Sequence, residues 1–345
     1  MNKGHGANIF KYSKSGELLD FSSNINPYGP TERVKKNIRE HLDLIARYPD
    51  VSYGKLFEAL ERYLGADKSH ISLGNGAMEV IDAAISLYEN IVIFEPAFME
   101  YEIRARVQKK NIKKRNLDAS FKPDVRDLDF DLKNTLVILT SPHNPSGVSL
   151  TKKEFDEIYE KVSESGGAIL MDEAFHEFSS VNYDLAKEIS KYKNLFVVRA
   201  ATKFFSLPGL RLGYMVSNFK EKIDNHIPTW SVSSLVENLG EDLFFDEEFI
   251  ISSKEKLAKP RDKLFSELQK IDGIYPLPSD ANYILIKTDF DNEKLFQNLL
   301  NKGILVRKCD NYDNLGHQYI RVAVKKDEDN EKLVKALKEE ENERF

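Results

Sequence analysis

Apolar residues in the middle of the chain follow two alternating patterns. Short runs of consecutive apolar residues alternate with longer segments whose apolar residues recur at helical spacing. A run without alternation predicts a strand buried on both faces, and a helix between successive strands predicts parallel pairing. The predicted strands include a short one directly after His70 and 91–94, 135–140, 168–171, 195–198 and 212–216, and the predicted helices include 98–109 and 151–163. We therefore expect an α/β fold with a mostly parallel sheet sandwiched by helices.

Changes in this pattern divide the chain into three predicted parts. Residues 1–30 hold too many Gly, Asn and Pro residues for a helix interior or a central strand, but Phe21 and Tyr28 stand among the polar residues. We predict that they form an N-terminal arm that docks near the active site. Residues 31–225 are expected to form a large domain, and residues 226–345 a linking helix and a small α+β domain.

Composition narrows the classes of function. The chain has 345 residues, of which 41% are hydrophobic and 31% charged, and no apolar run approaches the roughly 20 residues that cross a bilayer. The net charge is −6, and acidic and basic residues are mixed along the whole chain, so a surface that binds nucleic acid is not expected. Cys309 is the single cysteine and the 7 histidines include no HxxxH pair, so neither a disulfide nor a metal site is expected. The N-terminus lacks a hydrophobic signal segment, which favours a cytoplasmic location.

The segment 202–214, TKFFSLPGLRLGY, places one lysine among aromatic and aliphatic residues. These neighbours would draw Lys203 inward, where loss of hydration lowers the pKa of an amine and exposes the lone pair that attacks a carbonyl carbon. Lys203 is therefore suited to forming a Schiff base. Arg211 offers a planar donor fork to a phosphate, and Thr202 adds a hydroxyl. Taken alone, the segment could equally hold a buried ion pair.

Four further features follow predicted strands or open predicted helices. Gly76 and Ala77 lie in a Gly-rich turn whose backbone N–H groups could bind an anion. Phe98 could stack on a planar ring, and Asn144 sits between two prolines that hold its amide rigid. Asp172 ends a buried strand, where a carboxylate is costly unless a cation meets it. Each feature alone is more often purely structural. Because ligands of such sheets bind at the carboxyl ends of the strands, we expect the four to converge with the lysine.

Together these residues meet the needs of one cofactor. A lysine for a Schiff base, an acid beside a pyridinium nitrogen and a cup for a phosphate are what pyridoxal 5′-phosphate requires. Asp172 would keep the ring nitrogen protonated, so that the ring withdraws electrons from the substrate. The sequence therefore predicts a pyridoxal phosphate site.

The order of the motifs GNGA, EPAF, SPHNPSG, DEAF, TKFFSLPGLRLGY and IRVAV resembles the class I/II aminotransferase superfamily, which has fold type I, over nearly the whole chain. The resemblance implies that Lys203 is the catalytic residue and binds the cofactor, that Asp172 pairs with its ring nitrogen, and that Asn144 donates to its phenolic oxygen. Tyr48, in RYPD, matches a tyrosine that reaches the cofactor of the neighbouring subunit. The resemblance therefore implies a homodimer with shared active sites.

The same resemblance assigns the rest of the site. The residues that match the cup for the cofactor phosphate are Gly76, Ala77, Thr202 and Arg211. Phe98 matches the stacking ring, and Arg321 matches the arginine that binds the α-carboxylate of an amino acid substrate. Two positions depart from the common pattern. Phe175 replaces a tyrosine that bonds the phenolic oxygen in many aminotransferases, and Ala200 replaces a small hydroxyl residue of the phosphate cup.

Two branches of the superfamily share most of these motifs. Histidinol-phosphate aminotransferases share NPYGP, RYPD and GLRLGY, whereas threonine-phosphate decarboxylases of cobalamin synthesis also share DFSSNINPYGP, GNGA and GILVRKC. Our preferred hypothesis is decarboxylation of a small phosphorylated amino acid, and the alternative is a histidinol-phosphate type of transamination. A third reading, a cofactor-binding module without catalysis, lacks the N-terminal winged helix expected of a transcription regulator.

Further candidate substrate contacts lie outside these motifs. Arg307, His5 and Lys3 are candidates for holding a substrate phosphate, with His5 supplied by the docked arm. Asn26, in NPYGP, is another candidate substrate contact. For each phosphate candidate there is a structural alternative. Lys3 and His5 could lie in a mobile N-terminal tail, because such segments are usually mobile, and Arg307 could be an exposed cation on a strand.

Overall fold

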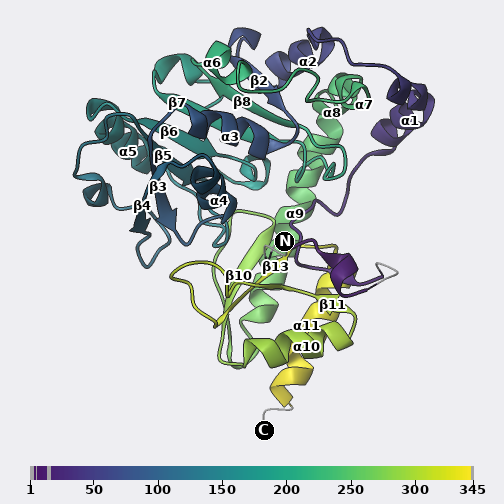
Figure 1. Ribbon diagram of the computed structural model, residues 1–345. Coiled ribbons are helices and arrows are strands. Elements are labelled where there is room, and N and C mark those ends of the chain that lie inside the picture. The colour runs from purple at the N-terminus through teal and green to yellow at the C-terminus, as the bar shows by residue number, and fades with distance from the viewer. Residues whose placement is uncertain (1–3, 5, 14–16, 343–345) are drawn as a thin grey trace.

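A seven-stranded sheet forms the larger part of the computed structural model, which describes residues 4, 6–13 and 17–342 (Figure 1). Its strands, in the order β2-β8-β7-β6-β5-β3-β4, are β2 (Ile71–Gly74), β8 (Gly213–Ser217), β7 (Leu195–Ala200), β6 (Ala168–Asp172), β5 (Thr135–Thr140), β3 (Asn90–Glu95) and β4 (Asn111–Asn116). Strands β3 to β7 pair in parallel, whereas β8 runs antiparallel to both of its neighbours. The mostly parallel sheet is confirmed.

Helices cover both faces of this sheet. Alternate residues of a buried strand point to opposite faces, so each strand contributes side chains to two hydrophobic cores. Leu136 and Ile138 of β5 pack in the core that contains residues of α3 (Ala77–Ser86) and α4 (Glu100–Val107). Val137 and Leu139 pack in the core of α5 (Lys152–Glu164). The remaining helices of this part are α1 (Glu32–Glu40), α2 (Gly54–Leu64), α6 (Lys220–Asp224), α7 (Ser234–Glu237) and α8 (Gly240–Phe244), with short 3-10 helices at Leu42–Ala46, Lys68–His70, Val125–Leu128, His176–Phe178 and Ile189–Lys191.

Strand β4 is the element of the large sheet that the apolar pattern does not predict. Its sequence, NIKKRN, is mostly polar, and none of its six residues is fully buried. It lies at the edge of the sheet and pairs with β3 alone. A strand at the edge of a sheet needs apolar residues on one face at most. The lysines of β4 also discourage pairing of this edge with another chain.

The smaller part of the structure follows the long helix α9 (Glu247–Leu268), which runs from the large sheet to a four-stranded sheet (Figure 1). That sheet has the order β12-β13-β10-β9 and is antiparallel throughout. Its strands are β9 (Ile274–Pro276), β10 (Tyr283–Thr288), β12 (Arg307–Lys308) and β13 (Tyr319–Ala323), and its helices are α10 (Asn292–Asn301) and α11 (Asp327–Asn342). Helix α8 still packs against α2, so the chain leaves the large sheet only at α9. The division at residue 225 stays a prediction.

The N-terminal segment joins the two parts. After a 3-10 helix at Ile9–Lys11, β1 (Leu19–Asp20) pairs in parallel with β11 (Ile304–Leu305) of the smaller part. Phe21 is fully buried, and its backbone bonds Leu305 and Ala323. The segment then crosses to the large sheet, where Thr31 caps α1 by accepting a hydrogen bond from the Val34 N–H. In the described part of the chain, no helix combines the length and apolar character of a membrane span.

Candidate active site

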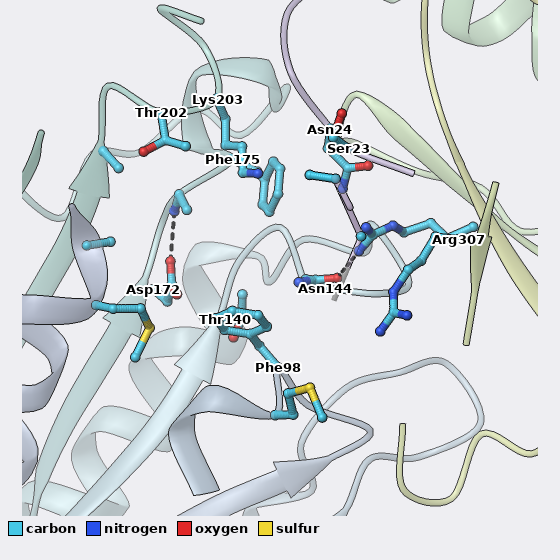
Figure 2. A pocket seen from close by; sticks show the side chains of 18 of the residues that line it. Ser23, Asn24, Phe98, Thr140, Asn144, Asp172, Phe175, Thr202, Lys203 and Arg307 are labelled. Carbon is cyan, nitrogen blue, oxygen red and sulfur yellow. Dashed lines mark hydrogen bonds between the residues drawn. The ribbon is translucent and has the colours of Figure 1, made fainter. Parts of the chain in front are cut away.

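A cavity of about 280 Å³ lies at the carboxyl ends of β5, β6 and β7, between the large sheet and the smaller one. Figure 2 shows Lys203 and Asp172 on one side of this cavity and Arg307 on the other. The predicted site residues that line it are Ala77, Phe98, Asn144, Asp172, Thr202, Lys203, Arg211, Arg307 and Arg321. Asp172 is the only carboxylate among the described lining residues, against four cations. The cavity is therefore suited to anionic groups.

The loop between β7 and β8 positions Lys203 at the cavity wall. The buried side chains of Phe204 and Phe205 hold the loop against the core. Burial, followed by the positive charges of Arg321 and Arg211, lowers the pKa of the Lys203 amine to about 8. The structure therefore provides the desolvated amine that the apolar neighbours in the sequence predict.

Asn26 lies behind this loop and does not line the cavity. Its backbone N–H donates to the Lys203 carbonyl at 3.0 Å, and its side-chain amide donates to the Phe204 carbonyl at 3.0 Å. In return, the Ser206 hydroxyl donates to the Asn26 carbonyl at 2.7 Å. The structure thus shows Asn26 bracing the lysine loop, and its predicted contact with a substrate stays a prediction.

Asp172 ends β6 with its side chain buried at the base of the cavity. One carboxylate oxygen accepts the Tyr101 hydroxyl at 2.6 Å, and the other accepts the Ala174 N–H at 2.9 Å. Burial raises the pKa of Asp172, although these two donors and the charge of Lys203 oppose the shift. A positively charged nitrogen beside this carboxylate would favour its ionised form. Tyr101 therefore fixes the orientation of Asp172.

A cradle suited to an anion lies at the N-terminus of α3. Gly76 has a φ of +82°, and a Cβ added there would lie 2.1 Å from Arg211 Nη2. A Cβ on Gly213 would lie 2.2 Å from the Ala77 nitrogen. Gly76 thus leaves room for the guanidinium of Arg211, and Gly213 leaves room for the backbone at the start of α3, a ten-residue helix. A guanidinium beside a helix N-terminus is an anion site. Gly76 shapes this cradle, although it is not among the residues that line the cavity.

Asn144 is held from the side of the smaller sheet. Its Oδ1 atom accepts hydrogen bonds from Arg321 and, at 3.1 Å, from the Tyr312 hydroxyl. Since Oδ1 is occupied by donors, the Nδ2 group remains to donate to a ligand. Arg321 also donates to the Ser22 carbonyl at 3.2 Å, so the N-terminal segment shares in this arrangement.

Arg307 and Arg321 are direct partners across strands β12 and β13. Their exposed fractions are only 8% and 6%. Among the described residues, neither guanidinium has an ion pair with a carboxylate, and Arg321 Nε has no hydrogen-bond partner. Like charges directly opposite on neighbouring strands repel, and burial increases the cost. The pair is therefore arranged for anions that come from outside the chain.

The other predicted residues are more scattered. Phe98 lines the cavity and packs edge-on against Tyr101, with the centroids of the two rings 5.6 Å apart. Phe175 also lines it, and its ring has no donor for a phenolic oxygen. Tyr48 is 79% exposed, outside the cavity, with its ring 4.6 Å from that of Trp230. Lys3 and His5 lie outside the described residues.

Several lining residues escape the sequence analysis. They are Ser22, Ser23, Asn24, Met99, Tyr101, Thr140, Asn311 and Tyr312. Tyr101 lies one helical turn after Phe98, a spacing that could have revealed it. Asn311 and Tyr312 lie in the loop CDNYDNLG, whose composition is that of an ordinary turn.

Comparison with known proteins places this site in a family. The family model described as "Aminotransferase class I and II" matches residues 16–337. A Caldanaerobacter subterraneus relative assigned to the threonine-phosphate decarboxylases is 35% identical over 347 residues, covering 97% of this chain and 93% of the relative. A Methanocaldococcus jannaschii histidinol-phosphate aminotransferase is 30% identical over 339 residues, covering 94% and 90%.

A solved structure is similar over almost the same length. The histidinol-phosphate aminotransferase of Clostridium acetobutylicum superposes with a TM-score of 0.88 and 36% sequence identity, covering 94% of this chain and 100% of that one. The match of the family model, the relatives and the shared fold all agree with the motifs in the sequence. The chain is an enzyme of the aminotransferase class I and II family.

Proposed function

We propose that the cavity binds pyridoxal 5′-phosphate, the cofactor that membership of this family implies. The residues present suit each part of the molecule: Lys203 its aldehyde, Asp172 its ring nitrogen, the Asn144 amide its phenolic oxygen, and the cradle of Arg211 and the α3 N-terminus its phosphate. Thr202 adds a hydroxyl and Phe98 an aromatic face. Phe175 and Ala200 supply no donor, so Asn144 and Arg211 carry correspondingly more of the binding.

When bound, pyridoxal phosphate would draw electrons from the α-carbon of an amino acid. The carboxylate of Asp172, held by Tyr101, would keep a proton on the ring nitrogen. The Nζ atom of Lys203 would carry a proton to or from the substrate α-carbon as general acid or base. Arg321 would fix the α-carboxylate of the substrate through its guanidinium.

The substrate that fits best carries a second anionic group. The observation that supports this is the buried pair of Arg307 and Arg321, opposite one another and without carboxylate partners among the described residues. One guanidinium suffices for an α-carboxylate, and the other is then available for a phosphate. His5, from the arm, remains a candidate for a further phosphate contact. We therefore assign a small phosphorylated amino acid as substrate.

The reaction proposed is decarboxylation of the threonine-phosphate type, with transamination of the histidinol-phosphate type as the alternative. The Caldanaerobacter relative and the N-terminal motif DFSSNINPYGP support the first. The similarity to the Clostridium structure supports the second, in which the substrate has a phosphate and no α-carboxylate, so that the two arginines would share a single anionic group. In the first reaction Lys203 delivers a proton to the α-carbon after carbon dioxide leaves. In the second, Lys203 removes the proton from that carbon.

One assay separates these reactions. The protein is loaded with pyridoxal phosphate and incubated with threonine O-phosphate or with histidinol phosphate, and carbon dioxide and pyridoxamine phosphate are both measured. Release of carbon dioxide from threonine O-phosphate, without build-up of pyridoxamine phosphate, supports the decarboxylase. Pyridoxamine phosphate without carbon dioxide supports the aminotransferase. Neither product from either compound would contradict the assignment of a phosphorylated substrate.

The lowered pKa of Lys203 predicts a pH dependence for cofactor attachment. Only the neutral amine attacks an aldehyde, so the rate of attachment to the cofactor-free protein is expected to rise about tenfold per pH unit below pH 8 and to level off above it. The rate is measured by stopped-flow absorbance after mixing with pyridoxal phosphate. A rate that keeps rising to about pH 10, the ordinary range of lysine, would show that Lys203 is not desolvated as described.

We also propose that the enzyme is a homodimer, built on an apolar patch that comprises Leu42, Ile45, Tyr48, Val51 and Trp230. Their exposed fractions range from 47% for Trp230 to 79% for Tyr48. The rings of Tyr48 and Trp230 are in contact, Val51 and Trp230 line one hollow, and Leu42 and Ile45 lie in the 3-10 helix just before Tyr48. Exposed apolar groups arranged in this way are typical of protein interfaces. Tyr48 belongs to this patch, and its resemblance to the tyrosine of the family that reaches the neighbouring subunit's cofactor supports a dimer with shared active sites.

The substitution Ile45→Asp is expected to weaken the dimer at least about tenfold, because it places a charge in an apolar contact. Sedimentation velocity over a range of protein concentrations measures the effect. Val107→Asp is the matched control, since Val107 is 60% exposed but lies at the end of α4, outside the patch. A wild-type protein that sediments as a monomer, or equal effects of the two substitutions, would exclude this interface.

A further inference from the structure

We propose that Asn311 determines the preference of the cavity for a substrate with a second anion, by holding Arg307 with a neutral amide. This inference rests on the proposed function, in which Arg307 binds the phosphate of the substrate. Asn311 lies in the loop between β12 and β13 and lines the cavity together with Arg307. It is a positioning residue, because it acts through the arginine.

The amide of Asn311 is fixed on both of its sides. Its Oδ1 atom accepts a hydrogen bond of 2.6 Å from Arg307 Nη2. Its Nδ2 group donates to the Gly4 carbonyl at 3.4 Å and to the Met99 sulfur at 3.4 Å. A Cβ added to Gly4 would lie 3.1 Å from this nitrogen, so the arm packs closely against it. These contacts orient the amide so that its oxygen faces the guanidinium, and no other hydrogen bond of that guanidinium is made with the described residues.

A neutral partner leaves the charge of Arg307 uncompensated, and another arginine of the chain shows the contrast. Arg199 is also buried, but its Nη2 atom lies 2.7 Å from carboxylate oxygens of both Glu173 and Asp184. Those two carboxylates balance the charge of Arg199 within the protein. An amide at 311 orients a guanidinium as a carboxylate would, and yet it keeps the full positive charge available to an incoming phosphate.

The substitution Asn311→Asp isolates this difference, because aspartate has nearly the shape of asparagine and adds a negative charge. It would occupy Arg307 with an internal ion pair and repel an incoming anion. Asn311→Ala removes the orienting hydrogen bond but leaves the charge of Arg307 intact. If charge carries the preference, aspartate must be more damaging than alanine. A role in packing alone predicts the reverse order, because alanine is the larger change in shape.

The experiment measures binding without turnover. Isothermal titration calorimetry on the cofactor-loaded enzyme compares 3-phosphonopropionate, which has two anionic groups and no amine, with butyrate, which has one. We expect Asn311→Asp to weaken binding of 3-phosphonopropionate about ten- to a hundredfold and Asn311→Ala at most about fivefold, with butyrate binding unchanged in both. Arg307→Gln, which removes the charge from the other side, must reproduce the loss seen with Asn311→Asp.

Each outcome decides the matter. Equal affinity of wild type and Asn311→Asp for 3-phosphonopropionate, or a greater loss with alanine than with aspartate, would overturn the role of Asn311. If Asn311→Asp does not fold, Arg307→Gln carries the test, and unchanged binding there would refute the inference. A wild type that prefers 3-phosphonopropionate but turns over no phosphorylated amino acid would refute the proposed function and leave the role of Asn311 intact.

Discussion

Replacement of Lys203 by alanine is expected to lower turnover of the phosphorylated amino acid by roughly 10²- to 10⁴-fold. The amine has two tasks in this account: it holds the cofactor, and its Nζ atom moves the proton at the substrate α-carbon. Its lowered pKa, about 8, keeps a useful fraction of the neutral form near neutral pH. Steady-state rates of the loaded enzyme, measured with threonine O-phosphate and with histidinol phosphate, give the size of the loss.

A second half-buried lysine provides the matched control for this substitution. Burial also lowers the pKa of Lys325, but that residue does not line the cavity. Lys325→Met is expected to retain most of the turnover, and its folding is checked by circular dichroism. Similar losses in both variants would mean that any buried lysine matters, and the special role given to Lys203 would fail.

The next largest effect is expected for Asp172→Asn, a decrease in turnover of about 10²- to 10³-fold. Asparagine retains the shape of the side chain but has no charge with which to hold a proton on a ring nitrogen. Because Asp172 is the only carboxylate among the described lining residues, none of the others can supply that negative charge. The rate of turnover and the affinity for pyridoxal phosphate, followed by fluorescence, are measured together.

Tyr101→Phe distinguishes the charge of Asp172 from its orientation. This substitution removes the 2.6 Å hydrogen bond to Asp172 and leaves the carboxylate in place. We expect a loss of roughly two- to tenfold, the value of one hydrogen bond. If phenylalanine at 101 proved as harmful as asparagine at 172, the orientation of the carboxylate, and not its charge, would be the decisive feature.

The sequence predicts which residues meet at the site better than it predicts the contacts among them. Asp172 and Asn144 follow apolar strands, and Lys203 follows a third, so their meeting at the carboxyl ends of a parallel sheet is a consequence of the alternating pattern. The direction of β8 is not predictable in this way, because an apolar run is the same in either direction. Strand β4 is missed since an edge strand has no need of an apolar run.

Contacts that depend on register or on loops are invisible in the pattern of residues. Arg307 and Arg321 are both candidates from the sequence, but only the pairing of β12 with β13 places them opposite one another. Asn26 looks like a substrate contact because it belongs to a motif of the family, and the structure uses it to brace Lys203. The roles of Asn311 and Tyr312 follow from how their loop packs against Arg307 and Asn144.

The most direct test of the central claim is to identify the side chain that binds the cofactor. The protein is mixed with pyridoxal phosphate, treated with borohydride, digested, and analysed by mass spectrometry. We predict a single pyridoxyl group, attached to the peptide that contains Lys203. Attachment to a different lysine, or a protein that takes up no pyridoxal phosphate at saturating concentration, would contradict the account.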